Sequence, residues 1–182
     1  AELPVLNRYY GAFRDGKIKV RGIEYRRRDA PSIIKDCQLE VINYLAHARD
    51  AAEFHALLPG ALKLVRTYVR RLYDGQVDAH NLLITKQLSK NPKEYRHNVM
   101  QAIAAKQLIQ EGLDVSAGQN VSYILQSESG ASVIPGELIN GPLKYDAQRY
   151  VQLLLDAIAS LLSPMGYSNA RLSKEIQQDP FS

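Results

Sequence analysis

The sequence contains one cysteine, four histidines and no long apolar run, and each shortage excludes a class of protein. Cys37 has no partner for an internal disulfide and falls among apolar residues at helical spacing, so we expect a small buried side chain in a cytosolic protein. A membrane-spanning helix needs about 20 consecutive apolar residues, and no stretch approaches that length. The histidines show no helical ligand spacing with a carboxylate on the same face, which argues against a metal site.

Motifs of familiar catalytic centres are also missing. There is no glycine-rich phosphate loop, no Gly-x-Ser-x-Gly turn and no His-Glu-x-x-His helix. No Asp-x-Asp occurs either, and phosphoryl transfer of the polymerase kind needs carboxylates that hold two metal ions about 4 Å apart. We therefore expect no catalytic residue, no metal ligand and no resident cofactor in this chain.

Positive charge is concentrated near the N-terminal end. The 182 residues carry a net charge of +4, with a sequence pI near 9.1. An apolar content of 46% with 23% charged residues is otherwise ordinary for a globular protein. Residues 7–29 hold eight basic side chains against three acids, and these are Arg8, Arg14, Lys17, Lys19, Arg21, Arg26, Arg27 and Arg28.

This basic segment is predicted to form a β-hairpin. Asp15-Gly16 is a strong turn signal between two β-prone arms. On the second arm Lys17, Lys19 and Arg21 alternate with Ile18, Val20 and Gly22, so the three cations share one face of the strand. Such cations repel one another, and a polyanion lying across the face would relieve the repulsion. A solvated sheet face would show the same alternation.

The flanks of the hairpin favour a nucleic-acid backbone site over a solvated face. The aromatic pair Tyr9-Tyr10 stands beside Arg8, and the run Arg26–Arg28 follows the second arm at once. Clustered cations with neighbouring aromatic rings are typical of surfaces that track phosphates.

The remaining residues predict helices with a few short strands. We expect helices over residues 31–48, 50–58, 59–75, 100–112 and 146–164, with strands over 82–85 and 118–125. Residues 127–144, rich in Gly, Pro and Ser, are expected to form a loop with little regular structure. The fold class is therefore α+β, a hairpin followed by a mostly helical domain.

The basic segment also resembles part of the family B DNA polymerases of the archaeal and bacterial polymerase II type. In that family a Lys-Lys-x-Tyr motif follows the last catalytic aspartate motif and leads through a hairpin into Arg-Gly-Leu-Glu-x-x-Arg-Arg-Asp. Asn7 and Ala30 depart from the family, which has a lysine and frequently a tryptophan there. The resemblance continues through nearly the whole chain, and its matching residues are Arg8, Tyr10, Arg21, Gly22, Ile23, Glu24, Arg27, Arg28 and Asp29.

The resemblance implies a division of the chain. Residues 1–29 would be the edge of the palm domain, 30–170 the thumb domain that wraps the primer–template duplex, and 171–182 a tail. The family's catalytic aspartates, with their Mg²⁺, would lie upstream. The resemblance thus implies a cytoplasmic, nucleoid-associated chain that binds primer–template DNA beside the palm, fingers and exonuclease of its polymerase, and is inactive alone.

DNA contacts are implied in two regions. Segments 84–86, 95–96 and 104–106 resemble the duplex-contacting part of the thumb, and residues 118–125 resemble the strand after it, with Ala117 in place of a proline. A salt bridge from Arg28 to Asp29 or Glu24 is an alternative role for that arginine, and core packing is an alternative for the alanines beside Lys106. The implied contacts are Arg8, Tyr10, Arg21, Arg27, Arg28, Lys86, Tyr95, Arg96, His97 and Lys106.

The C-terminal tail resembles the short peptide by which bacterial polymerases hold a sliding clamp. Gln177 is followed four residues later by Phe181, with Asp179 between them. One aromatic anchor on an extended end suits an apolar pocket, and Pro180 prevents continuation of a helix. A frayed end without function is the alternative.

Two other interpretations of the whole chain stay open. One is a non-catalytic helical interaction module, and the other is the small subunit of a split polymerase. The start without Met, almost directly in a hairpin arm, suggests an excised piece or a split subunit. Coding sequence upstream of Ala1 would discriminate between them.

Overall fold

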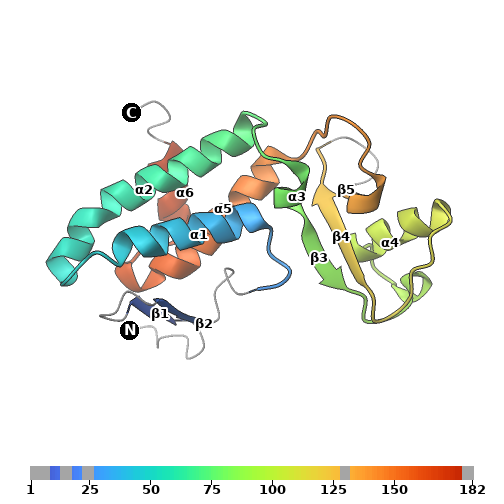
Figure 1. Ribbon diagram of the computed structural model, residues 1–182, viewed down its shortest axis with the longest axis horizontal. Coiled ribbons are helices and arrows are strands. Elements are labelled where there is room, and N and C mark those ends of the chain that lie inside the picture. The colour runs from blue at the N-terminus through green and yellow to red at the C-terminus, as the bar shows by residue number, and fades with distance from the viewer. Residues whose placement is uncertain (1–8, 13–17, 22–26, 128–131, 178–182) are drawn as a thin grey trace.

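The computed structural model describes residues 9–12, 18–21, 27–127 and 132–177. It has the predicted α+β character, with a helical layer beside a small antiparallel sheet (Figure 1). Within the described residues no helix is both long and apolar enough to cross a bilayer.

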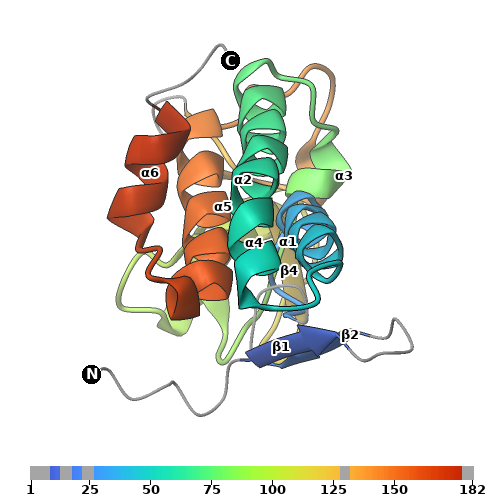
Figure 2. The same ribbon diagram turned by 90° about the vertical axis from the view of Figure 1, so that its left-hand side faces the viewer.

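Four helices make the first layer. α1 (Ser32–Leu45) packs against α2 (Ala51–Tyr73), and both pack against α5 (Ala147–Leu162). The C-terminal helix α6 (Asn169–Gln177) lies along α5 on the side away from α1 (Figure 2). The predicted inward residues of α5 are buried, among them Leu154, Ile158 and Leu161. Its N-terminus is capped as predicted, because the Asp146 carboxylate accepts from Arg149 N at 3.1 Å.

A three-stranded sheet makes the second layer. β3 (Ile84–Gln87), β4 (Asn120–Leu125) and β5 (Val133–Pro135) pair antiparallel in that order, with Ile84 opposite Tyr123 and Tyr123 opposite Pro135. Helix α4 (Met100–Gln110) packs on β4 and β5. The short elements beside the sheet are α3 (Ala79–Leu82), η2 (Pro92–Glu94), η3 (Gly136–Leu138) and η4 (Ser163–Met165).

The predicted hairpin is confirmed at the level of its strands. β1 (Tyr9–Ala12) pairs antiparallel with β2 (Ile18–Arg21), with Tyr9 opposite Arg21 and Ala12 opposite Ile18. The two strands lie below the helical layer in both views (Figures 1 and 2). The Asp15-Gly16 turn falls outside the described residues.

Buried hydrogen bonds join the two layers. The Tyr150 hydroxyl, on α5, donates to Leu82 O at 2.7 Å and accepts from Leu125 N at 3.0 Å. The Tyr145 hydroxyl donates to Leu72 O at 2.6 Å, and its ring meets that of Tyr150 edge-on at 5.9 Å. Because buried polar groups must be paired, these bonds fix α5 against both β4 and the end of α3.

The prediction of separate helices on either side of Pro59 is wrong. One helix, α2, runs from Ala51 to Tyr73 with Pro59 inside it and exposed. Proline removes one backbone donor from the helix, but Leu58, Ala61 and Leu62 are buried around it. That apolar face keeps the helix continuous. The predicted stop at Gly75 is confirmed, with φ of 70° just beyond the helix.

Two further boundaries differ from the sequence prediction. Residues expected to open a strand at 82 belong to α3 and the residue after it, and β3 begins at Ile84. The expected loop over 127–144 contains β5 and η3. Val133 is fully buried against the core, so burial of a very short strand outweighs its Gly- and Pro-rich surroundings.

Candidate nucleic-acid interface

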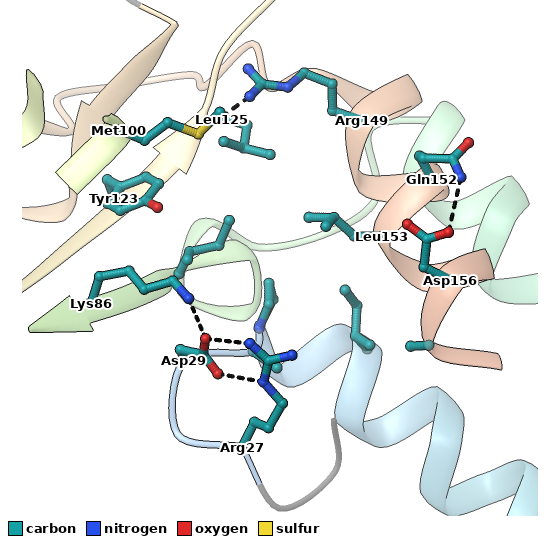
Figure 3. Close-up of a pocket in the computed structure, with 15 residues that line it drawn as sticks. Arg27, Asp29, Lys86, Met100, Tyr123, Leu125, Arg149, Gln152, Leu153 and Asp156 are labelled. Atoms are coloured by element: carbon teal, nitrogen blue, oxygen red, sulfur yellow. Dashed lines mark hydrogen bonds and ion pairs between the residues drawn. The ribbon is translucent and has the colours of Figure 1, made fainter. Parts of the chain in front are cut away.

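A cavity of about 500 Å³ lies where the helical layer meets the sheet (Figure 3). The segment before α1 and one side of α5 line it from the helical layer, and β3 and β4 line it from the sheet. Charged and polar side chains reach its walls from both layers. They are Arg27, Asp29, Lys86, Tyr123, Arg149, Gln152 and Asp156.

Asp29 connects two of the predicted DNA-contact residues at one end of the cavity. Arg27 donates to it in a fork, from Nε to Oδ1 at 2.9 Å and from Nη2 to Oδ2 at 2.7 Å. Lys86 Nζ, from β3, also donates to Oδ2 (Figure 3). Arg27 and Lys86 belong to separate parts of the chain, so the fold brings together two cations that sequence alone could not place side by side.

The ion pairs set the charge state of Asp29. Hydrogen bonding from Arg27, with a further contribution from Lys86, holds the pKa of this carboxyl well below its usual range, although partial burial acts in the opposite direction. The side chains stay in contact with solvent, with 22% of Asp29, 37% of Lys86 and 50% of Arg27 exposed. A solvent ion or a polyanion can therefore reach the cluster.

Arg149, on α5, and Tyr123, on β4, also line the cavity. The Arg149 guanidinium donates to Met100 Sδ at 3.3 Å and to Ser132 O at 3.5 Å. Tyr123 is 3% exposed, and burial raises the pKa of its hydroxyl. Sequence reasoning missed both residues. The alternation of Val121, Tyr123 and Leu125 along β4 is the signal that would have placed Tyr123 on an inner face.

Asp156, the second carboxylate of the cavity, has amide partners. Its Oδ1 accepts from Gln152 Nε2 at 3.1 Å and from Asn169 Nδ2. Among the described residues, no three Asp, Glu, His or Cys side chains gather in a way that could hold a metal ion.

The predicted contacts Tyr95, Arg96 and His97 lie between η2 and α4. The Tyr95 hydroxyl accepts from Ser89 N at 3.0 Å, and Lys90 Nζ lies 5.3 Å from the centre of its ring. Tyr95 thus holds the turn after β3 in shape. Arg96 and His97, which follow it in the chain, are exposed.

Lys106 and the neighbouring alanines have different environments. Lys106 is half-buried on α4, whereas Ala104 and Ala105 are fully buried in the core. The alanines therefore pack the interior of the protein, which is the alternative given to them above.

The other predicted site residues are distributed as follows. Arg28 is exposed, and the arginine that binds Asp29 is Arg27, so the alternative Arg28–Asp29 pair is wrong. Gln177 is the last residue of α6. The side chains of Tyr10 and Arg21 lie outside the described part of the chain, as do Arg8, Asp179 and Phe181.

Comparison with known proteins shows similarity to DNA polymerases of family B. The family model for DNA polymerase family B matches residues 6–165. A DNA polymerase of Thermococcus sp. (strain GE8) is 30% identical over 158 residues, 84% of this chain and 9% of that protein. A DNA polymerase of Methanocaldococcus jannaschii is 27% identical over 173 residues, 92% of this chain and 10% of that protein.

A solved structure is similar in fold as well. The family B DNA polymerase of Pyrobaculum calidifontis superposes with a TM-score of 0.72 at 26% identity, covering 88% of this chain and 21% of that one. The chain thus spans about a tenth to a fifth of the length of the relatives it matches.

Proposed function

This chain belongs to DNA polymerase family B, and on that premise we propose that it is the thumb, with an edge of the palm, of a DNA-directed DNA polymerase. It grips the primer–template duplex through the phosphate backbone and reads no sequence. Residues 1–29 form the palm edge, 30–170 the thumb and 171–182 a tail.

The observation that carries this proposal is the convergence of Arg27 and Lys86 at the junction of the two layers. Arg27 belongs to the segment that we assign to the palm edge, and Lys86, on β3, belongs to the segment that we assign to the thumb. Cations from both parts of the chain thus meet at one exposed place. Contacts to phosphate position a protein on any duplex regardless of its bases, which suits a polymerase that must copy every template.

Basic side chains between β3 and α4 would add further contacts to the duplex. Arg96, His97 and Lys90 are exposed there, and the Tyr95 hydrogen bond to Ser89 holds their backbone. A rigid cation needs less ordering on binding than a mobile one, so each contact retains more of its electrostatic gain.

Nucleotide transfer itself is assigned to the rest of the polymerase. The sequence has no Asp-x-Asp, and the described carboxylates do not gather into a metal site. The partners of the chain would be the palm, fingers and exonuclease parts of the polymerase, joined either in one polypeptide or as a split subunit. Purified chain with Mg²⁺, primer and template should give no extension above background, and templated extension would show that the catalytic centre is misassigned.

The grip is tested by fluorescence anisotropy with two labelled duplexes of unrelated sequence. The proposal predicts equal affinities within about twofold, because contacts to phosphate carry no sequence information. A strong preference for one duplex would mean that the chain reads base edges, and a folded chain that binds neither would leave the interaction-module interpretation.

We also propose a clamp-binding role for the tail. Gln177, at the end of α6, would fix the register of the peptide and Phe181 would enter an apolar pocket. A tether of this kind raises the effective concentration of the polymerase on DNA without a new duplex contact. Labelled tail peptide should bind a sliding clamp, and Phe181→Ala and Gln177→Ala peptides should bind less. Equal binding by all three peptides, or by none, would rule the role out.

A further inference from the structure

We propose that Arg27 and Lys86 form a phosphate site that the Asp29 carboxylate occupies while no DNA is bound, and that a backbone phosphate displaces this carboxylate when the duplex arrives. The inference rests on the proposed function. To that function it adds a specific site, the class of ligand that binds there (a phosphodiester anion) and an internal competitor, the Asp29 carboxylate.

The geometry of the cluster is that of an anion site. A guanidinium binds carboxylates and phosphates through the same two-bond fork, and a lysine ammonium adds a point charge to either. Here the fork is complete, with Arg27 atoms 2.7 and 2.9 Å from the two Asp29 oxygens. Lys86 shares one of those oxygens. A phosphodiester has two unbridged oxygens that can take both positions.

The three residues differ in how easily they can move. Lys86 is on β3, whose backbone is paired with β4. Asp29 lies between the hairpin and α1, in residues 27–31 that belong to no helix or strand. The carboxylate can therefore swing away without unwinding any element, while the lysine stays in place. Arg27 is half-exposed, so an incoming strand can approach the fork from solvent.

The exchange leaves no charge unpaired. Both cations have an anionic partner before and after it, and the released Asp29 carboxylate, already partly exposed, returns to water. Exposed ion pairs are individually weak, so the internal carboxylate can be displaced. It nevertheless lowers the affinity for DNA, because every phosphate that binds must first compete with it.

The test compares Asp29→Asn with Asp156→Asn in the full chain. Both variants remove one negative charge from the same cavity, but Asp156 binds amides rather than cations. Asp29→Asn should bind a 20-base-pair duplex about fivefold more tightly than the wild type at low salt, the effect of one nearby unit charge in a high-dielectric surrounding. Its plot of log affinity against log salt should be steeper by about one unit. Asp156→Asn should change both quantities much less.

A second variant covers the case in which Asp29→Asn distorts the segment before α1. Lys86→Met removes the ammonium and keeps the length of the side chain. If Lys86 binds a phosphate in the complex, Lys86→Met should flatten the plot of log affinity against log salt by about one unit. This holds even though Lys86 is paired with Asp29 in the free chain. If Lys86 only pins Asp29, the melting temperature should fall and the slope should not change.

The outcomes separate this inference from the proposed function. Duplex binding by the wild type, with Asp29→Asn binding no more tightly than Asp156→Asn, would overturn the phosphate-exchange site and leave the grip intact. An unchanged salt slope in Lys86→Met would do the same. Failure of the folded wild type and of all variants to bind DNA would overturn both.

Discussion

The hydroxyl of Tyr150 lies 2.7 Å from the carbonyl oxygen of Leu82, to which it donates a hydrogen bond in the interior of the protein. The same hydroxyl accepts from Leu125 N on β4. One fully buried side chain of α5 therefore holds the sheet in place, and with it the strand that carries Lys86. The cation cluster depends on this packing even though Tyr150 does not touch it.

Tyr150→Phe should lower the free energy of unfolding by about 2–4 kcal/mol. The substitution leaves the buried Leu82 carbonyl and the buried Leu125 amide without this hydrogen-bond partner. Each unpaired buried group costs about 1–3 kcal/mol of stability. Chemical denaturation measures the loss. Tyr73→Phe is the matched control, because Tyr73 is 56% exposed, and it should change stability by less than about 0.5 kcal/mol. Equal effects of the two variants would contradict the role given to Tyr150.

Pro59→Ala should stabilise the protein. Pro59 lies on the exposed side of an uninterrupted helix, and alanine restores the missing backbone donor and a better helix propensity. The interior penalty for proline is about 3 kcal/mol, and part of it is relieved by local bending, so we expect a gain of about 1–2 kcal/mol in the denaturation free energy. A loss of stability would show that the chain needs the proline-induced bend between the two halves of α2.

The stabilising effect of Asp29 should depend on pH. Its folded-state pKa is depressed by Arg27, so its contribution is complete above the unfolded value of about 3.9 and is lost as pH falls below it. Wild type should therefore melt above Asp29→Asn at pH 7, by an amount limited by the exposure of the pair, and the difference should shrink at pH 3. A difference that grows on acidification would contradict the ion pairing.

Substitutions of Arg96 and Lys106 test the proposed DNA contacts of the region around α4. Replacing either residue by alanine should flatten the salt dependence of duplex binding by about one unit if the side chain touches phosphate. Lys63→Ala provides a control, since Lys63 is an exposed cation on α2, and its loss should leave the slope unchanged. Unchanged slopes for both Arg96→Ala and Lys106→Ala would remove this region from the interface.

Local signals in the sequence predicted much of the fold. Asp146 capped α5 as expected, and the inward face of that helix followed its apolar spacing. The continuity of α2 through Pro59 was not predictable in this way, because it depends on burial against other helices. β5 was missed for a similar reason, since three residues show no period and its pairing partner lies on β4.

The candidate site could be predicted from the sequence less completely than the fold. Arg27 and Lys86 were each singled out by resemblance. Their meeting requires the folded chain, because Lys86 lies 57 positions from the Asp29 that both bind. Arg149 had no signal at all, because an arginine three residues after a helix cap is ordinary at the sequence level. The inward position of Tyr123 could have been predicted from the alternation of side chains along the strand. Its place on the cavity wall depends on the packing of α5 against the sheet.

The most direct test of duplex binding through phosphates is the affinity of the wild-type chain for one duplex across a salt series. If about four phosphates are neutralised, the plot of log affinity against log salt should be linear with a slope near −4. Circular dichroism at each salt concentration confirms that the chain stays folded. A slope near zero in a folded chain would contradict the account, because binding would then owe nothing to the phosphate backbone.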